Sequence, residues 1–150
     1  MRWMLGRYRR SVRFLGVLAW ASVPGGALAA DVEVAVGNVR NAQGHVLVAL
    51  CSKTDFLSLS CERQSGSPAR PGTVTVTIRD VRPDRYAVQA YQDENDNLKL
   101  DTNFLGLPVE GIGFGNDAKM LFGPPTYDDA AVIVPAAGMS IRLELRYTFD

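Results

Sequence analysis

Apolar and polar residues alternate along most of the chain after residue 30, and this alternation predicts β-strands. The clearest case is residues 73–78, Thr-Val-Thr-Val-Thr-Ile, where threonines take one face and apolar side chains take the other. Alternation of this kind, bounded by Gly, Pro, Asn and Asp, is typical of a half-buried strand. It predicts seven short strands, at residues 31–36, 44–50, 73–78, 85–91, 119–122, 130–134 and 140–149.

Seven short strands in about 120 residues indicate an all-β protein, a seven-stranded antiparallel β-sandwich with an immunoglobulin-like layout. In the last strand, the pattern places Ile141, Leu143, Leu145 and Tyr147 toward the core. We expect one domain over residues 30–150. Two connections, 52–72 and 92–117, are too long for hairpins, and long loops of this kind often carry function.

The first 29 residues have the composition of a cleavable signal peptide. Five arginines and no acidic residue precede a short apolar run, and Ala27-Leu-Ala29 supplies small residues at the expected cleavage site. The apolar run is shorter than the roughly 20 residues of a membrane-spanning helix. We therefore expect a periplasmic or secreted protein with no stable membrane insertion after cleavage.

Removal of the signal peptide changes the charge balance. The whole chain has 16 basic and 16 acidic residues, and without the five N-terminal arginines 11 basic residues stand against 16 acidic ones, a net charge of −5. This balance argues against nucleic acid as a partner, because such binding depends on Lys and Arg neutralising phosphates. In an oxidising compartment, the pair Cys51 and Cys61 predicts a structural disulfide, which stabilises by roughly 3 kcal/mol on the chain-entropy model.

The second long connection begins with a run of evenly spaced oxygen-bearing side chains. Asp93, Asn95, Asn97 and Asp101 match the first, third, fifth and ninth positions of an EF-hand calcium loop, and Lys99 at the seventh would contribute its backbone carbonyl. This spacing predicts a calcium-binding loop.

Two positions depart from that calcium-loop pattern. Leu98 stands where a glycine normally permits the sharp turn, and Phe104 stands where a bidentate Glu is expected. Glu110 or Asp117 is a candidate for the missing carboxylate. The alternative is a solvated turn without metal, since Asp and Asn also favour turns through local hydrogen bonds.

The segment 106–116 is rich in glycine, but it lacks the helix and the Lys-Ser/Thr pair of a phosphate-binding loop. Its flanking aromatics are either anchors for the loop or a contact surface for a ligand. The candidate ligand-binding residues are Phe104, Phe114 and Tyr127.

The runs 86–95, 99–116 and 123–130 resemble a bacterial family known as domain of unknown function 2141. The resemblance implies an exported β-sandwich similar to transthyretin-like and carboxypeptidase-regulatory domains, and it implies no activity. Gln92 and Leu98 stand where members of that family typically carry histidine and glycine. The acidic loop is also similar to calcium loops of bacterial surface adhesins, which favours calcium by analogy.

Catalysis is difficult to build from this set of residues. His45 is the one histidine of the chain, so arrangements that need several histidines, including those of enzymes with a related sandwich, are excluded. A carboxylate pair such as Asp93 with Glu110 has no spacing that demands glycosidase chemistry. We expect a non-catalytic envelope domain with a calcium-stabilised loop, or alternatively a metal-independent module that binds carbohydrate or peptide. The expected partner is an envelope protein or a glycan.

Overall fold

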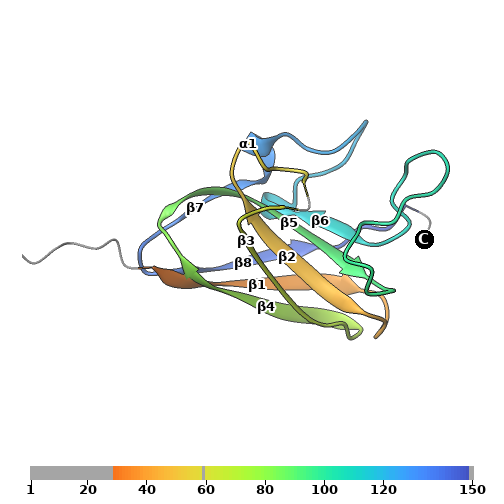
Figure 1. Cartoon of the computed structure of the whole chain (residues 1–150), viewed down its shortest axis with the longest axis horizontal. Coiled ribbons are helices and arrows are strands. Elements are labelled where there is room, and N and C mark those ends of the chain that lie inside the picture. Colours follow the sequence, from red (N-terminus) through yellow and green to blue (C-terminus); the bar gives the residue numbers. More distant parts are fainter. Residues whose placement is uncertain (1–28, 59, 149–150) are drawn as a thin grey trace, which may run out of the picture.

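The computed structural model describes residues 29–58 and 60–148 (Figure 1). All of the predicted signal peptide except Ala29 therefore lies outside the described residues. No helix in the described part of the chain has both the length and the apolar character needed to cross a bilayer.

The described residues form eight strands, one short 3₁₀ turn and one short helix. In chain order these are β1 (Ala30–Val39), β2 (His45–Cys51), β3 (Arg63–Pro68), β4 (Gly72–Val81), β5 (Asp84–Asp93), β6 (Ile112–Phe114), η1 (Gly115–Asp117), α1 (Tyr127–Ala130), β7 (Ala131–Val134) and β8 (Met139–Glu144).

The strands form two sheets that pack as a sandwich, which confirms the predicted all-β class (Figure 1). One sheet has the order β4-β1-β8. The other has the order β3-β2-β5-β6, and β7 pairs with the opposite end of β5. The prediction of a purely antiparallel sandwich was wrong in one place, because β1 runs parallel to β8. A parallel neighbour requires a crossover, and here the chain between β1 and β8 supplies it.

The core lies between the sheets and follows the predicted alternation. Val32, Val34 and Val36 of β1 are fully buried and face Ile78, Val76 and Val74 of β4. The residues Ile141, Leu143 and Leu145 are buried as predicted, and Tyr147 packs against the same cluster. Each buried aliphatic side chain contributes roughly 1.5–3 kcal/mol, so this cluster is the main source of stability.

Two strands lie inside the segments predicted to be loops. β3 has the sequence Arg-Gln-Ser-Gly-Ser-Pro, which lacks apolar alternation because it is an edge strand with no residue in the core. β6 has only three residues in the glycine-rich segment. The predicted strand at residues 119–122 is wrong, because this segment lies in an extended loop between η1 and α1.

A second, smaller hydrophobic cluster lies on the outer face of the β2-β5-β6 sheet. Ala87, Phe114 and Ala130 are buried there, and Phe56 and Tyr127 pack beside them. Phe56 makes edge-on ring contacts with both Phe114 and Tyr127, at centroid distances of 6.0 and 6.1 Å. This cluster attaches the 52–58 segment and α1 to the sheet.

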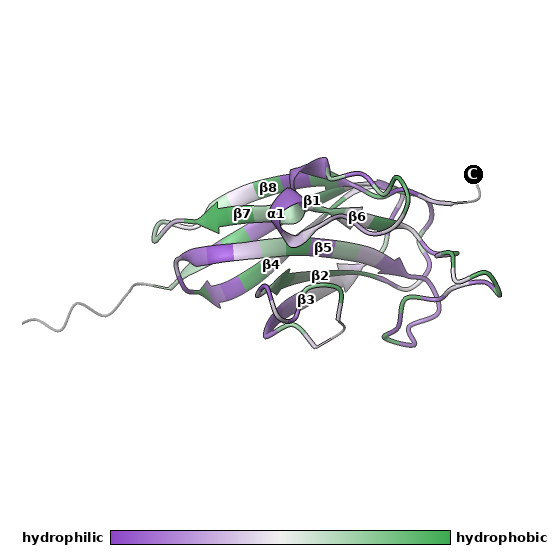
Figure 2. Ribbon diagram, turned by 90° about the horizontal axis from the view of Figure 1, so that it is seen from above, coloured by the Kyte–Doolittle hydropathy of each residue, from purple (hydrophilic) through white to green (hydrophobic). Residues whose placement is uncertain are grey.

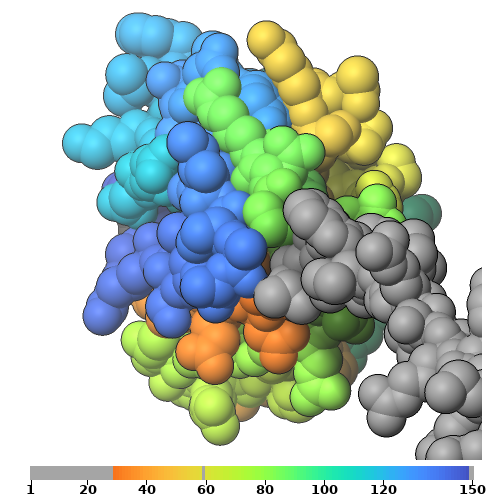
Figure 3. Space-filling model, turned by 90° about the vertical axis from the view of Figure 1, so that its left-hand side faces the viewer, coloured from red at the N-terminus to blue at the C-terminus, as the bar shows by residue number. Residues whose placement is uncertain are grey.

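The connection after β5, residues 94–111, projects from one end of the sandwich, where Figure 2 shows hydrophilic and hydrophobic colouring outside the strands. At the other end, the start of β1 lies beside the turn between β7 and β8 (Figure 3). Gly138 of that turn approaches the backbone oxygen of Asp31 so closely that a Cβ would lie 2.3 Å from it. The two ends therefore differ, with a tight chain crossing at one and the 94–111 connection at the other (Figure 2).

Candidate functional site

The acidic loop begins at Asp93, the last residue of β5, whose side chain is fully buried. Its Oδ1 accepts a hydrogen bond from the backbone N–H of Asn97 (3.1 Å), and its Oδ2 accepts one from the N–H of Leu98 (2.8 Å). A buried carboxylate is costly unless hydrogen bonds satisfy it. Asp93 is therefore satisfied by the loop that follows it.

The next three predicted ligands converge in the structure. The amide nitrogens of Asn95 and Asn97 donate to Asp101, at distances of 2.7 Å and 3.0–3.1 Å. The amide oxygens of the same two asparagines accept from the backbone N–H groups of Asn97 and Lys99. In this arrangement the loop closes through its own hydrogen bonds, and amide nitrogens occupy the positions from which a cation would contact Asp101.

Glu110 lies at the base of the loop and is 4% exposed. Its two carboxylate oxygens accept the backbone N–H groups of Glu94 (2.9 Å) and Asp101 (3.0 Å), which joins the two ends of the acidic run. Burial raises the pKa of Glu110, while those two hydrogen bonds act in the opposite direction. Asp117, the other candidate, lies in η1 and pairs with Arg146 at 2.6 Å.

Leu98 has a left-handed backbone, with φ of +59°, at the position where a calcium loop normally has glycine. The chain thus makes the sharp turn without the glycine. Leucine in this region costs roughly 1–2 kcal/mol. The Leu98 side chain is 68% exposed, so little packing offsets that cost.

Gln92, the residue before the acidic run, is fully buried. Its amide nitrogen donates to Asn41 Oδ1 (2.7 Å) and to the Gln43 backbone oxygen (3.2 Å). Its amide oxygen accepts from the Tyr147 hydroxyl (2.9 Å), and the Arg40 guanidinium lies 4.5 Å from the Tyr147 ring. This network fixes the base of the loop to the β1–β2 turn.

Two charged contacts tie the loop to the strands: Arg40 Nε lies 2.6 Å from Glu94 Oε1, and a second, more exposed pair involves His45. His45 Nδ1 lies 2.6 Å from Asp96 Oδ1. Among the described residues, no group of three or more His, Cys, Asp or Glu side chains is arranged to hold a metal ion.

The predicted disulfide is present between Cys51 and Cys61. It links the end of β2 to the 52–61 segment. Gln89 of β5 holds the same segment, because its amide nitrogen donates to the Ser58 backbone oxygen (2.8 Å) and its amide oxygen accepts from the Leu57 N–H (3.1 Å).

The three candidate ligand-binding aromatics do not form one surface. Phe104 is 95% exposed, whereas Phe114 is 2% exposed and belongs to the outer cluster. The Tyr127 hydroxyl donates to the Arg85 backbone oxygen at 2.7 Å, and Arg85 lies over its ring. Of the three, Phe114 lines a groove that the sequence did not predict.

This groove has a volume of about 1020 Å³ and lies on the outer face of β5 and β6. Tyr91 and Ile112, paired across these two strands, form part of its floor. The walls come from Leu57 and Ser58, the 99–108 part of the acidic loop and the 120–124 loop, with Leu107, Leu121 and Phe122 among the lining residues. We call it the outer groove.

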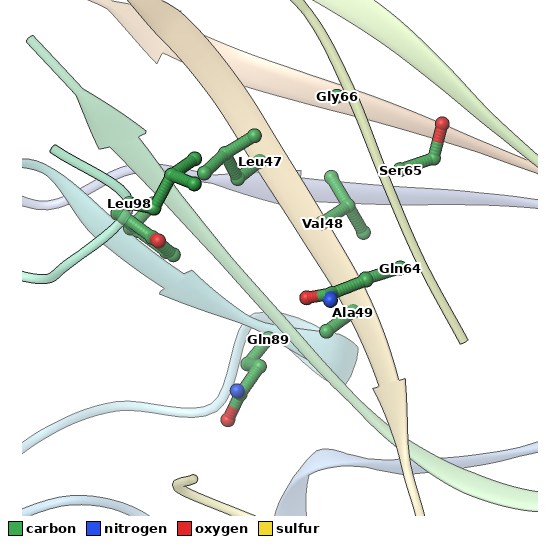
Figure 4. A pocket seen from close by; sticks show the side chains of 9 residues that line it. Leu47, Val48, Ala49, Gln64, Ser65, Gly66, Gln89 and Leu98 are labelled. Carbon is green, nitrogen blue, oxygen red and sulfur yellow. The ribbon is translucent and has the colours of Figure 1, made fainter. Parts of the chain in front are cut away.

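A smaller hollow of about 370 Å³ lies beside it, over β2, β3 and β5 (Figure 4). Gln89 and Tyr91 line both spaces. In the hollow, Gly66 of β3 lies opposite Leu47 of β2, and a Cβ on Gly66 would meet the Leu47 side chain at 2.5 Å. Burial, together with the nearby Asp93 and Glu110 charges, raises the pKa of Tyr91 to about 12.

The sequence carried a signal for one wall of the outer groove that the strand interpretation missed. Met120-Leu121-Phe122 is an apolar run followed directly by Gly123-Pro124-Pro125. Proline lacks the N–H that a ladder needs, so an apolar triplet beside two prolines is a poor strand. Leu121 and Phe122 are 77% and 106% exposed, as expected of a loop tip rather than a strand.

The fold defines a two-sheet β-sandwich domain with a groove on the outer face of one sheet. A bacterial family model, described as "Uncharacterized protein conserved in bacteria (DUF2141)", matches residues 34–142, and the chain belongs to this family. No curated protein and no solved structure matches the chain.

Proposed function

We propose that this protein is an exported, non-catalytic domain of the cell envelope that binds a ligand in the outer groove. The observation that carries the proposal is the distribution of exposed apolar side chains. Nine large hydrophobic residues are exposed in the described chain, and four of them, Leu57, Leu107, Leu121 and Phe122, line the groove. Exposed apolar side chains that gather around one groove mark an interaction site.

The dimensions of the groove support the same proposal. Ligand sites are concave, mostly apolar and roughly 300–1,000 Å³ in volume. The outer groove is about 1020 Å³, and polar groups such as Gln89 and the Tyr91 hydroxyl stand among its apolar lining residues. We place the domain in the periplasm or outside the cell, a location that the disulfide favours. A transthyretin-like sandwich, as the family resemblance implies, suits a binding module.

The test uses Nile red, a neutral dye that fluoresces in apolar sites, with the mature chain (residues 30–150). We expect saturable binding that Leu107→Asp and Leu121→Asp each reduce at least tenfold. Ile133→Asp is the matched control, because Ile133 is 74% exposed on β7 and does not line the groove. If the control reduces dye binding as much as the groove variants do, the outer groove is not the binding site.

A calcium-ordered acidic loop is a second candidate property. It is favoured by the left-handed turn at Leu98, the position of the calcium-loop glycine, and by the proximity of Asn95 and Asn97 to Asp101, although calcium would have to displace their amide nitrogens from that carboxylate. A cation that binds only the folded state raises its melting temperature by mass action. We expect a rise in millimolar calcium over chelator that Asp101→Asn abolishes. An unchanged melting temperature would leave the loop as a turn held by its own hydrogen bonds.

A further inference from the structure

The charges around the outer groove are unlike those of the rest of the molecule. The mature chain has an excess of acidic residues, yet the groove is lined by two cationic residues, Lys99 and Arg146, and by no acidic residue in the described chain. Arg146 is engaged by Asp117, whereas none of the ion pairs among the described residues includes Lys99. Lys99 is therefore the charge that the acidic loop presents to the groove.

The carboxylates of the acidic loop are directed to other partners. Asp93 and Glu110 each accept two backbone N–H groups, and Asp101 accepts the amides of Asn95 and Asn97. Their negative charges are thus held by hydrogen-bond donors within the loop. The groove side of the loop carries Lys99 and Leu100, with Leu107 and Pro108 from the returning chain.

From this complementarity we propose that the outer groove binds a monomeric anionic amphiphile, a single alkyl chain that ends in a carboxylate, with its head group at Lys99. This inference rests on the proposed function and gives it a ligand class. The apolar floor and walls accept the chain, and the local positive charge accepts the head. A membrane surface is disfavoured, because a domain of net charge −5 is repelled by anionic lipid as a whole, whereas one monomer meets only the local charge.

The test measures dissociation constants of octanoate, decanoate and dodecanoate, below their micelle concentrations, by chemical-shift titration of the ¹⁵N-labelled mature chain. Transfer of each methylene from water to an apolar site predicts about fourfold tighter binding per added carbon. The largest shifts should occur at Leu100, Ile112 and Leu121. Decanol should bind about two- to fivefold more weakly than decanoate, since an exposed ion pair contributes little.

Charge variants separate the head-group contact from the chain contact. Lys99→Glu should remove the preference for decanoate over decanol and leave decanol binding unchanged. Lys53→Glu makes the same change of charge at an exposed site outside the groove and should alter neither ligand.

The outcomes distinguish this inference from the proposed function. If Nile red binds in the groove but the affinity of the carboxylates does not depend on chain length, the amphiphile proposal is wrong and the proposal of a binding groove stands. If neither Nile red nor the carboxylates bind in the groove, both proposals are wrong. If the protein sediments with phosphatidylglycerol vesicles but does not bind monomeric carboxylates, the exposed loops bind a membrane surface, and the proposal of a monomeric amphiphile as ligand is wrong.

Discussion

Leu98 gives a direct measurement of backbone strain in the acidic loop, through its replacement by glycine. Leucine at φ +59° has a conformational strain of roughly 1–2 kcal/mol, which glycine does not have. Glycine also makes the unfolded chain more flexible than leucine does, and this higher entropy of the unfolded state lowers the free energy of unfolding by about 0.4–1 kcal/mol. The net effect of Leu98→Gly is a stabilisation of about 0.5–1 kcal/mol.

Leu105 is the matched control for this substitution. It is 67% exposed against 68% for Leu98, it lies in the same long connection, and its φ is negative. Leu105→Gly therefore lowers the free energy of unfolding through the entropy of the unfolded chain, and it relieves no backbone strain in the folded protein. The difference between the two variants isolates the strain, about 1–2 kcal/mol, because the entropic terms cancel.

The assay is thermal unfolding of both variants followed by circular dichroism. A domain of about 120 residues has an unfolding entropy near 250 cal/mol/K, so 1 kcal/mol corresponds to about 4 °C. We expect Leu98→Gly to melt about 4–8 °C above Leu105→Gly, with the wild type between them. Equal melting temperatures for the two variants would refute the left-handed turn at Leu98 and, with it, the described path of the acidic loop.

Three further predictions concern the supports of the loops. Removing the disulfide with Cys51→Ala/Cys61→Ala should destabilise by about 2.7 kcal/mol, from closure of a ten-residue separation, and should raise the urea m-value; an unchanged m-value would contradict a cross-link that acts on the unfolded chain. Gln92→Leu should lower the free energy of unfolding in urea by about 2–4 kcal/mol, because the buried partners of that amide lose their hydrogen bonds. A decrease below 1 kcal/mol would show that the network contributes little. Glu110→Gln leaves one acceptor for two N–H groups and should cost about 1–3 kcal/mol. Burial raises the pKa of Glu110 in the folded state, so the protonated carboxyl stabilises the fold at low pH, and this stabilisation is lost as the pH rises through the raised pKa. The difference in unfolding free energy between wild type and Glu110→Gln should therefore become smaller from pH 4 to pH 7. A difference that becomes larger over this range would contradict the raised pKa.

The sandwich was predictable because its buried strands obey a two-residue period. β1, β4 and β8 each alternate buried and exposed side chains over the core, and the sequence shows this directly. β3 was not predictable, because an edge strand without core residues has no such period. The parallel pairing of β1 with β8 was also beyond the sequence, since alternation fixes which face is buried and not which strand lies beside it.

The acidic loop was predictable in its position and its convergence, and the groove was not. Spaced Asp and Asn residues predicted either a calcium loop or a turn held by local hydrogen bonds, and in the structure the Asn95 and Asn97 amide nitrogens donate to Asp101. The groove requires three segments that are distant in the chain, at residues 57–58, 99–108 and 120–124, to reach one sheet face. Contact between these three segments depends on the tertiary fold, which the composition of the chain does not predict.

The buried polar residues explain why the acidic loop and the outer groove belong together. Within the described chain the buried polar or charged residues are Gln92, Asp93 and Glu110, and all three lie at the base of the acidic loop. Each is costly to bury and each is satisfied by hydrogen bonds to backbone or to neighbouring side chains. Their effect is a long loop held in one conformation, and the outward side of that loop is a wall of the groove. A wall that is already ordered loses little conformational entropy when a ligand binds, so the polar base of the loop would favour the proposed amphiphile without touching it.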